Sequence, residues 1–366
     1  MIVVAEIGTS HGGSLEKAKA LIDAAADSGA DAVKLQWVYA DEILHPDTGY
    51  VNLPSGRIRL YDRFKELEVA PDFFAECASY ARQKKMLFIC SPFGLKSLSQ
   101  LLELKPDAVK IASPELNHFP LLQALAEYRS SHKIPVILSS GVSRLADIEA
   151  ALSILGRDDL TLLHCITSYP APESEYNLRL IKSLSQIFGV KTGVSDHSLD
   201  PVLVPSLSAA MGGEMLEKHI TLSKETDGLD DPVALNPEEF AHMCYCIHQC
   251  EAMIRRYSLS CGGDNITEEM EEQYGKEKVQ AVLGDGVKRL AKSEEANYGR
   301  TNRSLHFMRA MKEGQIIGPQ DIGLLRTEKV LSPGLGPQFL ENIIGARLAK
   351  DTANGAGVQW DDVIRL

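Results

Sequence analysis

The sequence predicts an α/β protein built on a (β/α)8 TIM barrel, followed by a small β-rich domain. Short apolar, β-branched runs alternate with amphipathic stretches of helical period over residues 1–220. Polar residues end nearly every one of these runs, and the rhythm changes after about residue 300. We therefore expect a barrel with a helical extension at 1–285, a linker at 286–300 and a tail domain at 301–366.

The runs that we expect to form the eight barrel strands lie at residues 2–6, 32–36, 87–91, 108–111, 136–139, 160–164, 192–195 and 215–219. Each is followed by a helical pattern, so the crossovers carry helices and the strands must run parallel. An open doubly wound sheet is the alternative, but it gathers its ligands at one switch point. Polar strand ends spread along the whole chain are typical of a barrel.

Two connections stand out from this regular pattern. Residues 37–69 form an unusually long link, rich in Pro and Gly, between the second and third barrel strands, and long ordered loops are usually functional. We expect a lid or an interface element there. After the last barrel strand, residues 237–257 predict a helix, and the small residues at 258–265 predict a surface loop.

Composition narrows the class of protein. The chain has 366 residues with a net charge of −12, which argues against a protein whose main partner is nucleic acid or a membrane surface. No apolar run approaches the roughly 18 residues that a membrane helix needs. Hydrophobic residues at 44% are typical of a globular protein, and we expect a cytoplasmic one.

Two lysines, Lys34 and Lys110, lie at the ends of predicted strands. A lysine inside a barrel is costly unless its charge is used, so the pair predicts a phosphate or carboxylate site. Two other interpretations remain open. One lysine can form a Schiff base with a carbonyl substrate, as in an aldolase, or both can pair with barrel carboxylates such as Glu6 and Glu217.

Hydroxyl groups accompany these lysines at four strand ends, where they offer donors to phosphate oxygens. They belong to Ser91, Ser113, Ser139 and Ser195. Each alone is as well explained as a helix N-cap. The four together, beside two lysines, form a stronger signal than any one of them.

Two histidines, His197 and His219, end consecutive predicted strands, so their imidazoles are expected to converge over the barrel mouth. Two histidine ligands leave open positions on a divalent ion for water and substrate oxygens. Lewis-acid catalysis requires such open positions. A lone histidine would more often be a satisfied core residue.

With these residues in place, the chain resembles the sialic acid synthases, which condense phosphoenolpyruvate with aldoses to make N-acetylneuraminate, legionaminic acid and pseudaminic acid. The resemblance covers the whole chain, and its tail looks like an SAF (antifreeze-like) domain. The motifs that carry it are Ala5-Glu-Ile-Gly8, His11-Gly-Gly13, Asp31-Ala-Val-Lys-Leu-Gln36, Ser91-Pro-Phe93, Lys110-Ile-Ala-Ser113, Ser139-Ser-Gly141, Leu163-His-Cys165, Ser195-Asp-His197, Glu217-Lys-His219 and, in the tail, Arg303-Ser304-Leu305 through Gly314 to Ile344-Gly345.

The resemblance implies a role for each site residue. His197 and His219 would bind Mn2+ or Mg2+, and Glu6 would act as a general base. The tail domain would cap the barrel of the partner in a domain-swapped homodimer. Phosphoenolpyruvate would be held by Lys34, Ser91, Lys110, Ser113, Ser139 and Ser195, and the sugar by Gln36, Glu115, Tyr169, Asp230 and Arg326.

The chain departs from the family pattern on the side of the sugar. Ser10 and Thr167 stand where the family usually has Asn, and Asp231 stands where it usually has His. The usual Arg-Pro-Gly of the tail reads Leu331-Ser-Pro-Gly334, so Arg326 is the expected substitute. These changes allow an acceptor other than N-acetylmannosamine, or a catalytically inactive homologue that only binds sugar phosphates.

Overall fold

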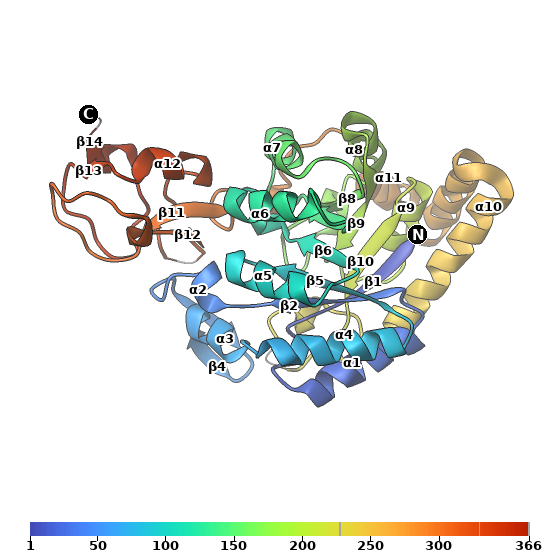
Figure 1. Ribbon diagram of the computed structural model, residues 1–366. Coiled ribbons are helices and arrows are strands. Elements are labelled where there is room, and N and C mark those ends of the chain that lie inside the picture. The colour runs from blue at the N-terminus through green and yellow to red at the C-terminus, as the bar shows by residue number, and fades with distance from the viewer. Residues whose placement is uncertain (227, 329, 365–366) are drawn as a thin grey trace.

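The computed structural model describes residues 1–226, 228–328 and 330–364. Its centre is a closed barrel of eight parallel strands, which confirms the predicted fold (Figure 1). Neighbouring strands pair in chain order around the barrel. They are β1 (Ile2–Gly8), β2 (Ala32–Trp37), β5 (Leu87–Pro92), β6 (Ala108–Ile111), β7 (Val136–Ser139), β8 (Leu160–Cys165), β9 (Lys191–Asp196) and β10 (Met215–His219).

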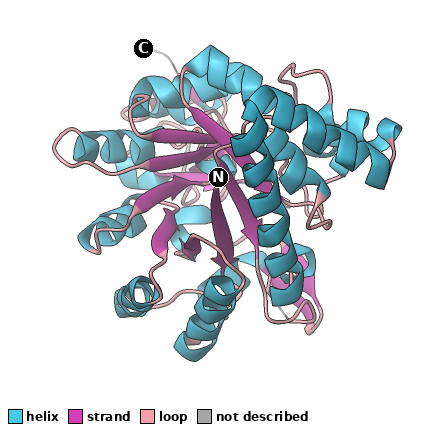
Figure 2. Cartoon of the chain, turned by 90° about the vertical axis from the view of Figure 1, so that its right-hand side faces the viewer, coloured by secondary structure: helices cyan, strands magenta, loops and turns pink. Residues whose placement is uncertain are grey.

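Helices surround the barrel, as Figure 2 shows in a view with the N-terminus at the centre of the strands. Their apolar faces pack on the outer side of the strands in one large core cluster. They are α1 (Leu15–Asp27), α4 (Pro71–Gln83), α5 (Leu95–Glu103), α6 (Phe119–Arg129), α7 (Leu145–Leu155), α8 (Leu180–Phe188), α9 (Leu203–Ala210), α10 (Pro237–Tyr274) and α11 (Lys276–Leu283).

The interior of the barrel has an apolar floor with polar side chains above it. A separate core cluster contains Val4, Ala32, Ile89, Ala108, Ile137, Leu163 and Met215. Because side chains on a strand alternate between faces, the residue two positions later on each strand points inward again, one layer higher. That next layer contains Glu6, Lys34, Ser91, Lys110, Ser139, Cys165 and Glu217.

The prediction of a surface loop at 258–265 is wrong. Helix α10 reverses at Ser258, whose φ is 73°, and the chain then continues as helix to Tyr274. A Cβ on Gly262 would lie 2.8 Å from Ile254 Cα, and one on Gly263 would lie 2.6 Å from Ala210 O. These two glycines allow helices to approach closely, so they are packing residues and not loop residues.

The long connection at 37–69 contains structure of its own, with α2 (Ala40–Ile43), a hairpin of β3 (Tyr50–Leu53) and β4 (Gly56–Arg59), and α3 (Leu60–Glu66). It contacts the tail domain of the same chain. Leu44 forms a parallel bridge with Arg326, and the Thr48 hydroxyl donates to Thr327 O at 3.0 Å. The connection is therefore an interface element, one of the two roles expected for it.

The tail domain lies beside the carboxyl ends of the barrel strands, next to α2 and α6 (Figure 1). It contains the antiparallel pair β11 (Arg303–Phe307) and β12 (Ile322–Arg326), the short strands β13 (Arg347–Leu348) and β14 (Val363–Ile364), and helix α12 (Leu340–Ile343). A small apolar core of its own includes Leu305, Phe307, Ile343 and Val358. Within the described ranges, we find no helix with the length and apolarity to cross a membrane.

Candidate active site

A cavity of about 300 Å³ opens at the carboxyl ends of the barrel strands. Residues from most barrel strands and from the tail domain line it. Of the residues expected from the sequence, the lining includes Glu6, Lys34, Gln36, Lys110, Ser113, Ser139, Tyr169, Ser195, His197, His219, Asp230 and Arg326. Ser91 and Glu115 are also buried, but they lie behind this lining.

Glu217 is the centre of charge at the bottom of the cavity. One of its oxygens, Oε1, lies 3.3 Å from Lys34 Nζ and 3.6 Å from Lys110 Nζ, and accepts a hydrogen bond from Ser195 Oγ at 3.0 Å. Burial alone would raise the pKa of Glu217, but the ammonium groups of Lys110 and Lys34 lower it to about 2. This pairing keeps two lysines tolerable inside the barrel.

Glu6 lies beside Glu217 and the two lysines, and only one of its carboxylate oxygens is bonded to them or to Gln36. Its Oε1 is 3.1 Å from Lys34 Nζ and accepts from Gln36 Nε2 at 2.7 Å. Its Oε2 is buried without a hydrogen-bond partner among the described residues. Burial raises the pKa of Glu6 to about 7, although Lys34 opposes the shift. A carboxyl group with this pKa is suited to accepting and returning a proton near neutral pH.

The two histidines converge as expected. The ring centroids of His197 and His219 are 5.6 Å apart, and Tyr169 stacks on His197 at 4.2 Å. His197 Nδ1 lies 2.7 Å from the carbonyl oxygen of Ile166, which fixes the ring by one of its two nitrogens. His219 Nδ1 is buried with no hydrogen-bond partner within the described ranges.

The opposite end of the cavity, toward the tail domain, is partly apolar. Asp230 and Arg326 reach it together with four apolar side chains. Those four come from helix α3, from the residue directly after it, and from the loops after β5 and β10, and they are Phe64, Leu67, Phe93 and Leu229. Sequence analysis named Phe93 only as part of a motif and did not name the other three, because single apolar residues in loops carry no periodic signal.

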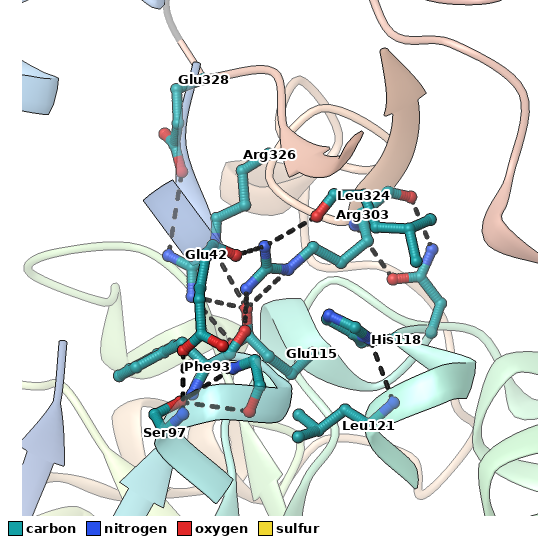
Figure 3. Close-up of polar contacts among 12 residues, drawn as sticks. Glu42, Phe93, Ser97, Glu115, His118, Leu121, Arg303, Leu324, Arg326 and Glu328 are labelled. Carbon is teal, nitrogen blue, oxygen red and sulfur yellow. Dashed lines mark hydrogen bonds and ion pairs between the residues drawn. The ribbon is translucent and has the colours of Figure 1, made fainter. Parts of the chain in front are cut away.

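Behind this end, Glu115 holds two arginines of the tail domain (Figure 3). Arg303 donates to Glu115 Oε1 through Nε at 3.0 Å and Nη2 at 2.8 Å. Arg326 donates from Nη2 to Oε1 at 2.9 Å and to Oε2 at 2.8 Å. Glu115, which the resemblance implied as a contact of the sugar, therefore bonds to guanidinium groups and is not part of the cavity lining.

The segment between the two domains is fastened to the loops around the site. Glu294 is buried, and its Oε1 accepts from the backbone N–H groups of Val142 and Thr167, each at 2.7 Å. Lys288 donates to Ser140 O at 3.1 Å. These contacts fix the loops after β7 and β8, and the second of these loops carries the cavity residues Thr167 and Tyr169.

A family model described as the NeuB family matches residues 21–258, and a model of the SAF domain matches residues 302–364. The chain belongs to the NeuB family. The resemblance to sialic acid synthases is thereby confirmed for both the barrel and the tail. The match also agrees with the position of the cavity, because a TIM-barrel site lies at the carboxyl ends of the strands.

Named NeuB-like relatives align along almost the whole chain. The N,N'-diacetyllegionaminic acid synthase of Campylobacter jejuni is 30% identical over 359 residues, which cover 96% of this chain and 97% of the relative. The spore coat polysaccharide biosynthesis protein SpsE of Bacillus subtilis is 30% identical over 370 residues, covering 100% and 94%.

Two solved structures agree with the NeuB assignment. The crystal structure of SpsE from Bacillus subtilis has a TM-score of 0.79 at 28% identity, covering 100% of this chain and 95% of that one. An N-acetylneuraminic acid synthetase from Leptospira borgpetersenii, solved in complex with citrate, has a TM-score of 0.60 at 28% identity, covering 81% and 89%.

Two residues outside the expected site set organise this NeuB site. Glu217 pairs with both lysines, as one interpretation of the sequence had it, and it lies two positions before His219 on the same strand, so it faces the same interior. Glu294 was placed in the linker. Its role as acceptor for two loop amides depends on contacts 127 and 152 positions away along the chain, which no local pattern reports.

Proposed function

We propose that this chain is a nonulosonic acid synthase, which condenses phosphoenolpyruvate with an N-acetylmannosamine-type aldose in the presence of a divalent metal. The observation that carries the proposal is the joint placement of two lysines, their shared carboxylate Glu217 and the pair His197 and His219 in one cavity. The names of the legionaminic and pseudaminic acid synthases among the relatives support it.

Phosphoenolpyruvate would bind at the bottom of the cavity. A trianionic ligand needs cations and hydrogen-bond donors, which Lys34 and Lys110 offer, and Ser195 would turn its hydroxyl from Glu217 to the ligand. The hydroxyl of Ser139 is buried with no partner among the described residues, so it is ready to donate to a ligand. Ser113 accepts from Gly141 N at 2.9 Å and can still donate its own proton. Ser91 would act indirectly. Its hydroxyl oxygen accepts a hydrogen bond from Lys34 Nζ at 3.5 Å, and Lys34 would contact the ligand.

His197 and His219 fit a divalent metal ion, Mn2+ or Mg2+. The carbonyl of Ile166 fixes one ring by its Nδ1, and the Nδ1 of the other is a buried atom without a partner within the described ranges. Two imidazoles leave open positions for water and substrate oxygens. When bound, such an ion would supply Lewis-acid polarisation of the aldehyde oxygen.

The reaction balances without an external oxidant or reductant. C3 of phosphoenolpyruvate forms a bond with the aldehyde carbon of the open-chain sugar, water adds to C2, and the former aldehyde oxygen takes up the proton that the water loses and becomes a hydroxyl. The bond between C2 and the phosphate oxygen breaks, so that inorganic phosphate leaves. Glu6, with its spare oxygen and a pKa of about 7, would take the proton from the water or from the sugar hydroxyl.

The aldose would occupy the end of the cavity toward the tail domain. Gln36, Tyr169 and Asp230 offer hydrogen bonds to a neutral polyol, and Arg326 reaches the same space from the tail domain. Four apolar side chains line this end as well. The acceptor is therefore expected to carry apolar substituents, such as acyl methyl groups, beside its hydroxyls.

A Schiff-base aldolase is the second candidate, and one observation favours it. Burial lowers the pKa of Lys110, and a Schiff base needs a neutral lysine. Against it, Lys110 shares the carboxylate of Glu217 with Lys34, which stabilises the charged forms. Reduction of the enzyme with borohydride in the presence of substrate would attach substrate to Lys34 or Lys110 only in an aldolase.

The deciding experiment is phosphate release from phosphoenolpyruvate with Mn2+ against a panel of aldoses, including N-acetylmannosamine, its 6-phosphate and diacetamido sugars. We expect release that needs phosphoenolpyruvate, one aldose and the metal together. His219→Ala should abolish it while circular dichroism shows an intact fold. Release without any aldose, or release unaffected by a chelator, would refute the proposal. Binding without turnover across the panel would favour the inactive homologue.

A homodimer and a cytoplasmic location stay predictions.

A further inference from the structure

Three short motifs lie at the ends of neighbouring barrel strands, and each has a middle residue that the proposed mechanism does not use. The motifs are Leu163-His-Cys165 on β8, Ser195-Asp-His197 at the end of β9 and Glu217-Lys-His219 on β10. Their flanking residues line the cavity or its apolar floor. Because side chains alternate along a strand, the middle residues His164, Asp196 and Lys218 lie on the outer side of the barrel wall, where all three are buried.

Lys218 donates to the two residues that flank His197 in the sequence. Its Nζ donates to Asp196 Oδ2 at 2.6 Å, to Ser198 O at 2.6 Å and to Ser198 Oγ at 3.2 Å. Lys218 and Asp196 are also register partners of the parallel strands β10 and β9. Since Lys218 directly precedes His219 and Asp196 directly precedes His197, the ion pair joins the two strand ends that present the histidines.

Tyr176 connects this ion pair to the backbone of His197. Its hydroxyl donates to Asp196 Oδ1 at 2.7 Å and accepts from His197 N at 2.7 Å. Tyr176 is itself held from strand β8, because His164 Nε2 lies 2.5 Å from Tyr176 O and the two rings meet edge to face. A polar network therefore runs behind the barrel wall from β8 through Tyr176 and Asp196 to β10.

His197 is held at three atoms by one segment, the connection after β8. Besides the Tyr176 hydroxyl at its backbone N, its backbone O accepts from Ala171 N at 3.0 Å, and its Nδ1 lies 2.7 Å from Ile166 O. His219, in contrast, is a residue of β10 and pairs regularly with β1. The position of one imidazole relative to the other therefore depends on how the end of β9 is held against β10.

The network is more exact than stability alone requires. Desolvation of two buried charges offsets much of their attraction, so a buried ion pair adds little stability over apolar packing. Both carboxylate oxygens of Asp196 and the ammonium of Lys218 nevertheless have partners at hydrogen-bond distance. Two imidazoles that share one ion need fixed positions, and groups behind metal-binding histidines commonly set the affinity for the metal.

We infer that Tyr176, Asp196 and Lys218 are positioning residues, which hold His197 and His219 at the separation that a divalent metal ion needs. The inference rests on the proposed function for the presence of the metal. None of the three side chains lines the cavity as described. They act through the main chain on either side of the two histidines, so the outer residues of the motifs belong to the metal site as much as the inner ones.

The first test measures Mn2+ binding without substrates, by electron paramagnetic resonance of the free ion. Tyr176→Phe removes the hydroxyl and keeps the ring. We expect the Kd for Mn2+ to rise about 10- to 100-fold, while the Kd for phosphoenolpyruvate at saturating Mn2+, measured by calorimetry, stays within about twofold. A general loosening of the fold would weaken both. Unchanged Mn2+ affinity in a folded Tyr176→Phe protein would overturn the inference.

The matched control for this variant is Tyr80→Phe. It removes a tyrosine hydroxyl that also bonds to an aspartate, Asp23, at 3.0 Å, but between helices α1 and α4. Its Mn2+ affinity should equal that of the wild type. An equal loss of affinity in Tyr80→Phe and Tyr176→Phe would overturn the specific role of Tyr176.

The second test removes both charges of the ion pair at once, with Asp196→Asn and Lys218→Met, so that neither charge is left unpaired. We expect the Kd for Mn2+ to rise about 10-fold or more. The control is Glu173→Gln with Lys278→Met, a partly exposed pair at 2.6 Å that involves the same connection after β8. It should bind Mn2+ as the wild type does.

Adding Tyr176→Phe to the variant without the ion pair tests whether the three residues act as one network. The combined effect on the Kd for Mn2+ should be smaller than the product of the separate effects. A full product would mean that the tyrosine and the ion pair act independently, which would overturn the network. If the variant without the ion pair does not fold, the result with Tyr176→Phe alone decides.

His219→Ala separates failure of this inference from failure of the proposed function. If the wild type binds Mn2+ and His219→Ala does not, the metal site stands, and wild-type affinity in Tyr176→Phe would overturn the positioning role alone. If Mn2+ binds as expected but no aldose supports phosphate release, the proposed function fails and this inference stands. A wild type that does not bind Mn2+ would overturn both.

Discussion

The hydroxyl of Ser10 donates a hydrogen bond to the carboxylate of Asp231, 221 positions away along the chain. Ser10 and Asp231 are two of the positions at which the chain departs from the family pattern, and they contact each other. The other carboxylate oxygen of Asp231 accepts from the Thr226 hydroxyl. The loop that carries Leu229 and Asp230 into the cavity is therefore held to the loop after β1 by a contact between two positions that depart from the family pattern.

Ser10→Ala should destabilise the protein by about 1–3 kcal/mol, because it removes a donor from a buried carboxylate. Denaturant unfolding measures this change. Combined with Asp231→Asn in a double-mutant cycle, the pair should show a coupling energy of about 0.5–3 kcal/mol. Strictly additive effects would show that the contact has no energetic weight.

Glu217→Gln should cost about 3–5 kcal/mol of unfolding free energy, because two buried lysines lose their shared counter-ion. The KM for phosphoenolpyruvate should change as well, since the lysines no longer have fixed positions. Glu214→Gln, directly before the same strand β10, is the matched control. Its pair with Lys191 is exposed, so the expected cost is below about 1 kcal/mol. Equal effects of the two variants would contradict the central role of Glu217.

Acid should weaken the fold through His118. Its Nδ1 accepts the Leu121 N–H at 3.2 Å, and burial, together with the nearby Arg303, lowers its pKa to about 3. Below the ordinary histidine pKa, the unfolded chain binds a proton that the folded one does not. The unfolding free energy should therefore fall as the pH drops from about 6.5, by up to about 3 kcal/mol at about pH 4.

His118→Asn keeps a side-chain acceptor at the N-terminus of α6 but cannot titrate. Its unfolding free energy should fall less steeply with acid than that of the wild type, measured by denaturant titrations at several pH values. The exposed His132→Asn is the control and should keep the wild-type slope. A wild-type slope in His118→Asn as well would show that His118 is not the cause.

Glu294→Ala should lower kcat/KM and cost about 1–3 kcal/mol of stability, because the amides of Val142 and Thr167 lose their acceptor. Steady-state kinetics and unfolding measure the two effects. The neighbouring Glu295 is exposed, so Glu295→Ala should behave as the wild type. If both variants have full activity, the linker does not shape the site.

Much of the barrel could be predicted from the sequence, because its signals are local. Every predicted barrel strand overlaps an observed one, and three of them, at residues 108–111, 136–139 and 215–219, have identical bounds. The strand expected at 87–91 differs only by Pro92 at its end. Period-two alternation then places a polar layer above the apolar floor. The strand-end lysines and histidines meet in the cavity for the same reason.

What could not be predicted depends on contacts between distant segments. Nothing near Glu115 in the sequence indicates that two arginines of the tail occupy both of its oxygens. The glycines at 262 and 263 have a turn-like composition but serve helix packing, and only the positions of Ile254 and Ala210 reveal this. Tertiary packing overrides local preference at such positions.

The contact between Glu115 and Arg303 joins positions 188 apart, and this has a consequence for how such enzymes can change over time. A recombination event that exchanged the tail at residue 301 would bring an unrelated pair of residues against Glu115. A substitution at Glu115 would likewise have to await a compensating one in the tail. Barrel and tail are therefore expected to be inherited as one unit, and a new acceptor specificity has to arise in both at once.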